Sequence, residues 1–256
     1  MKKLLAITLI GSFAMADFLS ISGGAGMWNE NISGYTKSGS DINYFNKDDG
    51  NPDTGNLKLQ DKVRPYVWVK LIHPIPLVPN LKVQYTRYST SGRDGTVVGS
   101  VDVFGETITG AGTADTDMSI NSYDATFFYE LKSALTLGFE IEAGVGVNVL
   151  DGTTDLTINK TDTTHTTWTI GIPYLYGRVE TPTFFGFSAE AQAKYLDIDT
   201  AYYHDYQTKV KYHLPLPIID LTMSAGYRTQ TIYGEDGDKS TKLKYNGIFA
   251  EVGARW

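Results

Sequence analysis

The chain has 256 residues, no cysteine and a formal net charge of −7. The acidic balance argues against a nucleic-acid partner, and the lack of cysteine excludes disulfides and thiol chemistry. With 17 tyrosines and 26 glycines the composition favours β structure, and 41% hydrophobic residues is compatible with a barrel, where only every second strand residue meets lipid.

The N-terminus has the parts of a secretion signal. Lys2 and Lys3 precede an apolar run over residues 4–13, which Ala14-Met15-Ala16 follows. That run is too short to span a bilayer as a helix, which needs about 20 residues. We expect a cleavable signal peptide over 1–16 and a single domain over 17–256, with a short N-terminal core helix as the alternative.

Ten segments of period-two alternation follow, and they predict an all-β fold, a transmembrane antiparallel β-barrel of about ten strands. The approximate limits are 17–31, 61–73, 80–90, 116–131, 134–149, 164–180, 184–198, 201–213, 218–233 and 240–256. Pro173 interrupts the sixth segment and suggests a bulge. Eight strands are the alternative, in which 91–115 or 150–163 forms an extended external hairpin with its neighbours.

The connections between these segments alternate in length. Those after the even-numbered segments are short, for example Lys132-Ser133, whereas 32–60, 91–115 and 150–163 are long and polar. Short periplasmic turns and longer external loops are typical of outer-membrane barrels, and an even strand number brings both termini to the periplasm.

The two ends of the mature chain resemble known sequences. The final residue, Trp256, closes an amphipathic strand and resembles the C-terminal signal read by the bacterial barrel-assembly machinery, although Ala254 replaces a second aromatic residue that is common there. The segment 17–28, with Gly23-Gly24, is similar to a family of small Gram-negative outer-membrane barrels named for such a Gly-Gly pair. That resemblance implies a fold and a location, with no established activity and no catalytic residues.

If the apolar face of each segment meets lipid, the opposite face lines the lumen. Its predicted charged residues are Arg64, Lys70, Lys82, Asp124, Glu130, Glu140, Glu142, Glu190, Lys194, Lys209, Lys211, Asp220, Arg228, Glu251 and Arg255. These charges nearly balance, and a ten-stranded barrel is narrow, so we expect them to pair and to plug the lumen. A soluble barrel, with these charges outside, is the alternative.

The histidines offer little catalytic chemistry. His204 could share a site at the external rim with Asp197 and Asp199, which would suggest an omptin-type hydrolase, but adjacent His204 and Asp205 point to opposite faces of a strand. His165 begins a His-Thr-Thr run that lacks the serine of lipid-hydrolysing barrels. We therefore predict no catalytic, cofactor or metal site.

Two function classes remain from the sequence. The first is a structural or surface-interaction barrel of the Gram-negative cell envelope, monomeric, with outer-membrane lipid, lipopolysaccharide and the assembly machinery as partners. The second is a porin-like narrow channel or a binding barrel for small, possibly apolar solutes, with Trp28, Trp68, Phe128 and Phe249 on the lumen side. No residue pattern separates these two classes.

Overall fold

The computed structural model describes residues 19–47, 51, 53–75, 77–131, 137–216 and 219–256. The expected signal peptide over 1–16 lies outside the described residues. Among those residues, no helix is long and apolar enough to cross a membrane.

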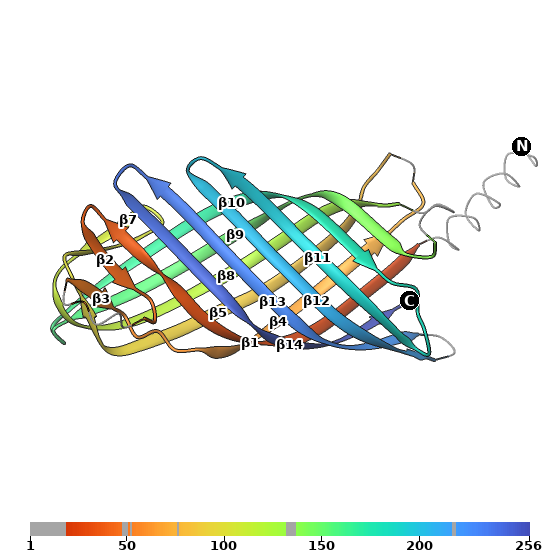
Figure 1. Cartoon of the computed structure of the whole chain (residues 1–256), viewed down its shortest axis with the longest axis horizontal. Coiled ribbons are helices and arrows are strands. Elements are labelled where there is room, and N and C mark those ends of the chain that lie inside the picture. The colour runs from red at the N-terminus through yellow and green to blue at the C-terminus, as the bar shows by residue number, and fades with distance from the viewer. Residues whose placement is uncertain (1–18, 48–50, 52, 76, 132–136, 217–218) are drawn as a thin grey trace, which may run out of the picture.

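The described residues form an antiparallel barrel, and the prediction of an all-β barrel is confirmed. Its long strands are β1 (Ser20–Ser38), β4 (Lys62–Ile72), β5 (Asn80–Val97), β8 (Gly112–Leu131), β9 (Glu140–Ile158), β10 (Asp162–Glu180), β11 (Phe187–Ile198), β12 (Ala201–Pro215), β13 (Asp220–Asp236) and β14 (Lys239–Arg255). Each long strand pairs with the next in this order, and β14 pairs with β1 to close the ring (Figure 1).

Four short strands lie at one end of the barrel. β2 (Asp41–Tyr44) and β3 (Thr54–Asn56) follow β1, while β6 (Ser100–Val103) and β7 (Glu106–Thr109) form a separate hairpin between β5 and β8. We call this the loop end (left in Figure 1), and the opposite end, where β1 begins and β14 finishes, the terminal end. The tallest hairpins of the wall also reach the loop end.

Two expectations about local structure were wrong. The segment 150–163 is not a loop, because Leu150–Ile158 continues β9 and pairs with β10 up to a short turn. Its many Thr and Asp residues resemble loop sequence, but the alternation continues with Leu150 and Leu156 buried inside. Pro173 marks no bulge, since β9 and β10 pair in one unbroken register from Glu140–Glu180 to Ile158–Asp162.

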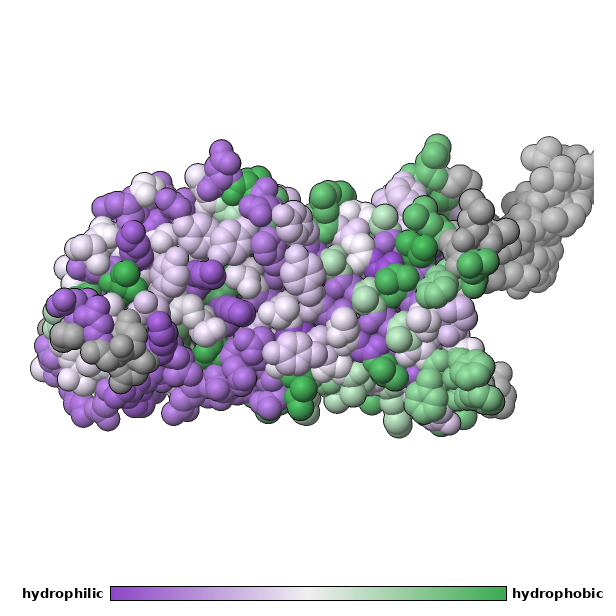
Figure 2. All heavy atoms as spheres, in the orientation of Figure 1, coloured by the Kyte–Doolittle hydropathy of each residue, from purple (hydrophilic) through white to green (hydrophobic). Residues whose placement is uncertain are grey.

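The outward side chains divide into two zones along the barrel. Toward the terminal end they are exposed and apolar, and we call this zone the apolar belt. It includes Ile21, Met27, Val63, Val67, Val69, Val83, Phe127, Leu131, Val145, Leu175, Val179, Val210, Met223, Ile248 and Val252. Toward the loop end the outward side chains are polar, as at Asp117, Asp151 and Lys244. Figure 2 shows this division on one face.

The inward side chains show the opposite division. In β9 the belt residues alternate with buried Glu142 and Asn148, whereas beyond Val149 the buried residues include Leu150, Thr154 and Leu156 and carry no charge. The same exchange occurs in β8, where Asp124 is inward at belt level and Met118 is inward beyond it. The barrel therefore has a polar interior inside its apolar belt and an apolar core inside its polar zone.

Candidate functional site: the charged lumen

Inside the apolar belt, charged side chains from many strands meet in the lumen. The inward cations are Arg64, Lys70, Lys82, Arg178, Lys194, Lys209, Lys211 and Arg228. The inward anions are Glu30, Asp124, Glu130, Glu142, Glu180, Glu190, Asp205 and Glu251. These two sets balance, so that the lumen as described has no net formal charge.

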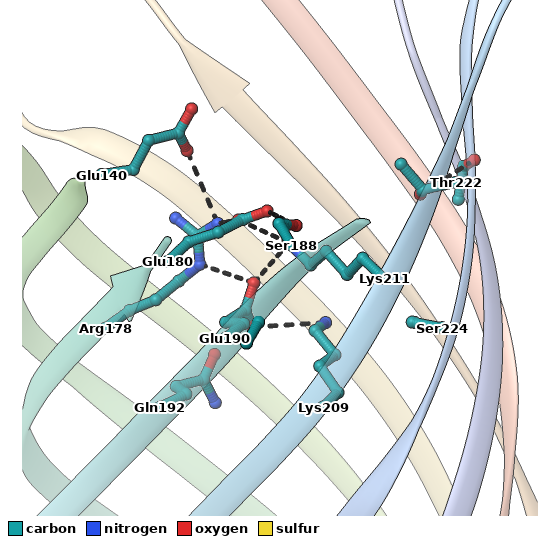
Figure 3. Close-up of polar contacts among 12 residues, drawn as sticks. Glu140, Arg178, Glu180, Ser188, Glu190, Gln192, Lys209, Lys211, Thr222 and Ser224 are labelled. Atoms are coloured by element: carbon teal, nitrogen blue, oxygen red, sulfur yellow. Dashed lines mark hydrogen bonds and ion pairs between the residues drawn. The ribbon is translucent and has the colours of Figure 1, made fainter. Parts of the chain in front are cut away.

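The largest group of contacts surrounds Arg178 (Figure 3). Its guanidinium donates to Glu190 at 2.8 Å and also contacts Glu142 and Glu180. Lys211 lies 2.6 Å from Glu180 and 2.5 Å from Glu190. Four strands, β9, β10, β11 and β12, thus contribute charges of both signs to one network near the terminal end.

Neighbouring strands extend this network across the lumen. Lys209 contacts Glu190 at 3.3 Å and Glu251 at 3.0 Å, which joins β12 to β14. Lys70, on the opposite wall, lies 2.5 Å from Glu142. Lys82 donates to the amide oxygen of Gln192 at 3.1 Å, and its ammonium lies 5.7 Å from the Trp68 ring centre. Side-chain ion pairs and hydrogen bonds between non-adjacent strands therefore occupy the middle of the barrel.

Two further ion pairs lie closer to the apolar core. Lys194 donates to Asp124 at 2.7 Å, and the same carboxylate accepts a 2.8 Å hydrogen bond from Tyr174. Arg228 holds Asp205 through two hydrogen bonds of 2.9 and 2.7 Å, and its guanidinium stacks 4.5 Å from the Trp28 ring centre.

A third pair joins β1 to β4. Arg64 donates to Glu30 at 2.8 Å, and both side chains are almost completely buried. Buried charges in such surroundings need partners, because an unpaired ion carries a large desolvation cost.

The structure places the predicted lumen residues in two groups. Twelve of them lie inside the barrel as described above. Glu140, Asp220 and Arg255 lie at the mouth of the terminal end, where they line a cavity of about 110 Å³, and the Glu140 side chain is 48% exposed. Trp28, Phe128 and Phe249 are buried on the lumen side, as expected from the alternation, and the partly buried Trp68 packs against the same apolar cluster.

Four network residues were missed: Glu30, Arg178, Glu180 and Asp205. Arg178 and Glu180 share the inward face of β10 with Tyr174 and Tyr176, but Pro173 made the phase of that segment uncertain. Asp205 could have been found from the alternation, because it precedes inward Lys209 and Lys211 by even steps along β12.

The suggested rim site around His204 is an aromatic cluster on the outer surface. The His204 ring stacks on Tyr195 at 4.8 Å and on Tyr202 at 5.2 Å. Its Nε2 lies 3.9 Å from Asp197, and that carboxylate accepts a 3.1 Å hydrogen bond from Tyr195. Asp199 lies in the turn after β11. Asp205 points to the lumen, on the face of β12 opposite to that of His204.

Comparisons with known proteins find barrels of the same general architecture. The chain is similar to Neisserial surface protein A (12% identity, 93% of this chain and 95% of that one, TM-score 0.30). It is also similar to the Escherichia coli outer membrane protease OmpT (9%, 93% and 96%, TM-score 0.40) and to OprG of Pseudomonas aeruginosa (13%, 93% and 95%, TM-score 0.28). No family model and no curated protein matches the chain.

Proposed function

We propose that this chain is an integral outer-membrane barrel with a closed lumen, with a structural or surface-interaction role in the cell envelope. The apolar belt would meet lipid, the terminal end would face the periplasm, and the polar zone would project outside among the lipopolysaccharide. Supporting this orientation, the belt residues are exposed on strands whose inward neighbours are charged and buried.

The main evidence for a closed lumen is that its charged side chains pair across the barrel from one wall to the other. Contacts such as Lys70–Glu142 and Lys194–Asp124 join strands that are not neighbours in the ring, so their side chains cross the interior. An ion-selective pore instead needs an excess of one charge sign at a constriction. The balanced set of cations and anions therefore favours a barrier over a passage.

A second barrier lies at the loop end. The β6–β7 hairpin packs there, where the Asp102 carbonyl accepts hydrogen bonds from Thr36 and, at 2.9 Å, from Thr241. Val101, Val103 and Ile108 of this region are buried in the apolar core of the barrel. Free diffusion through the barrel would have to disrupt both the hairpin packing and the ion pairs.

We further propose that the protein is monomeric, has no catalytic function and is inserted by the barrel-assembly machinery. The surroundings of His204 support the lack of a catalytic function, because aromatic rings rather than a hydrogen-bonded carboxylate hold this side chain. For assembly, the terminal strand β14 closes the ring against β1, and Trp256 exchanges backbone hydrogen bonds with Ile21 at 2.9 and 3.3 Å.

Single-channel recording on the refolded protein in planar bilayers tests the closed lumen. We expect no stable conductance from the wild type, with an open porin in the same bilayers as the positive control. Deletion of residues 100–109 serves as a second sample, because the flanking Gly99 and Gly110 are joined by a 2.8 Å backbone hydrogen bond and can be linked directly. We expect this deletion to remain closed, since the ion pairs at belt level stay in place. A large steady conductance from the wild type would contradict the proposal.

A further inference from the structure

The wall of the barrel has a notch between β10 and β13, directly above the apolar belt. β10 and β11 pair from Glu180–Glu190 as far as Leu175–Tyr195, and beyond this point β11 pairs with β12 alone. Pro173 lies where the pairing stops, and proline has no N–H to donate to a neighbouring strand. The β11–β12 hairpin also ends early, at residues 199–200, whereas the hairpins on either side of it extend further toward the loop end (Figure 1).

Behind the notch is a cavity of about 500 Å³, which we call the lateral recess. Its apolar lining comprises Phe104, Ile170, Ile172, Leu196, Ile198 and Ile232. Most of these side chains belong to the inward face of the wall, and Phe104, Ile170, Ile172 and Leu196 pack against the apolar core but stay partly exposed. A cavity of this size is within the ~300–1,000 Å³ typical of small-molecule sites.

Phe104 reaches the recess from the β6–β7 hairpin. Its backbone has a φ of +50°, which side chains with a Cβ rarely adopt, and its ring packs 4.9 Å from the ring of Trp168. The hairpin is fixed beside it, because the Phe104 N–H donates to Thr241 and the Asp102 carboxylate accepts from Gly105 and Thr107. The β6–β7 hairpin therefore forms a fixed inner wall of the recess, and the barrel strands form its outer wall.

Several polar groups that line the recess are already bonded to neighbouring residues. The Tyr233 hydroxyl donates to Glu235 at 2.5 Å, and this hydrogen bond raises the pKa of Tyr233 to about 12. The Lys239 ammonium donates to Thr107 at 2.9 Å. Among the described residues, no lining side chain has a buried polar atom that lacks a partner. The lining therefore has no buried polar atom that requires a hydrogen-bonding or charged ligand. Glu235 and Asp236 at the rim would repel an anion.

We propose that the lateral recess binds a small, uncharged, largely apolar molecule that enters sideways through the notch. Entry from the outer leaflet rests on the proposed membrane placement, because the notch lies directly above the belt at Leu175 and Tyr195. Binding itself is separate from the closed lumen. A conducting barrel could still bind such a molecule, and a closed barrel could leave the recess empty.

Photolabelling with adamantyl diazirine, a compact apolar probe, tests this proposal. The purified protein in phospholipid nanodiscs is irradiated with the probe, and labelled peptides are located by mass spectrometry. We expect labels on 102–105, 170–173 and 196–202, and we expect excess adamantane to remove them. Labels on the belt residues 141–149 report the probe dissolved in lipid and serve as the internal reference.

Two tryptophan variants make the test specific. Ile198→Trp replaces an aliphatic side chain of the recess with a larger aromatic ring and should abolish labelling there. The Ile198 side chain is 54% exposed, so the barrel should tolerate the change. Thr167→Trp, on the exposed outer face of β10 away from the recess, should leave labelling unchanged. Labels confined to the belt, or equal recess labelling in the two variants, would overturn the proposal.

Discussion

Two arginine–aspartate ion pairs of this protein have similar distances but lie in opposite surroundings. Arg228 holds Asp205 by hydrogen bonds of 2.9 and 2.7 Å with both side chains buried. Arg93 holds Asp117 by hydrogen bonds of 2.7 and 2.9 Å with both side chains about half exposed. The pairs differ in burial, and also in that Arg228 uses two guanidinium nitrogens whereas Arg93 uses one.

Arg228→Met should lower the free energy of unfolding by about 3–5 kcal/mol, because it leaves the Asp205 carboxylate buried without its partner. Arg93→Met should lower it by about 0–1 kcal/mol, since water replaces the lost partner. Urea unfolding of the reconstituted barrel, followed by tryptophan fluorescence, measures both values. Adding Asp205→Asn to Arg228→Met should recover part of the loss. Equal effects of Arg228→Met and Arg93→Met would show that the lumen at Arg228 is filled with water.

Trp256 should matter more for assembly than for stability. Its side chain is 59% exposed, while its backbone closes the ring against Ile21. Trp256→Ala keeps the backbone bonds, so the refolded barrel should unfold at the same urea concentration as the wild type. The amount recovered in the outer-membrane fraction of cells should fall, because the proposed recognition element is missing. Wild-type amounts in that fraction would remove the support for such an element.

Along the strands, inward glycines are covered by aromatic rings from the strand beside them. Each pair consists of directly opposite residues: Gly24–Trp68, Gly26–Tyr66, Gly146–Tyr174 and Gly152–Trp168. A Cβ atom at Gly146 would lie 2.3 Å from the Tyr174 ring. Glycine at these positions lets a large ring lie flat against the wall of a narrow lumen, as in the pairing of strand glycines with aromatic residues in designed sheets.

Gly146→Val should therefore destabilise the barrel, by about 1–3 kcal/mol for overpacking alone. The displaced Tyr174 ring would also weaken its 2.8 Å hydrogen bond to Asp124. Gly177→Val is the matched control in a neighbouring strand, because a Cβ atom there meets nothing within 4 Å. The same urea titration compares the two variants. Equal midpoints for Gly146→Val and Gly177→Val would mean that the ring moves aside at no cost.

At the scale of the whole molecule, the two outward zones predict where the bilayer lies. Val145 is 55% exposed within the apolar belt, and Thr153 lies on the same outward face of β9 in the polar zone. In vesicles, Val145→Arg should cost about 2–4 kcal/mol if the site is near the midplane, because a cation faces hydrocarbon. Thr153→Arg should cost close to nothing. Equal unfolding free energies for the two variants would favour the soluble barrel over the transmembrane one.

Local sequence patterns were enough to predict the barrel and the two faces of most strands. Alternation in a strand depends only on the neighbouring residues, since successive side chains point to opposite faces. The inward positions of Glu142, Lys209 and Arg228 follow from this local rule, and so does the separation of His204 from Asp205. For β10 the alternation did not settle which residues point inward, because Pro173 interrupts the pattern. For 150–163 the sequence predicted a loop, because a strand with a polar outer surface resembles loop sequence.

Which charges meet, and where the wall has its notch, depends instead on how the strands close into a ring. Lys194 and Asp124 are 70 residues apart, and their contact depends on barrel closure and on strand stagger across the ring. The packing of β6–β7 at the loop end likewise depends on partners such as Thr36 and Thr241, which are 66 and 139 residues from Asp102. The lateral recess requires hairpins of unequal height around one barrel. Alternation along a strand assigns each side chain to a face. Its partner across the lumen depends on the tilt and stagger of every strand that lies between the two residues.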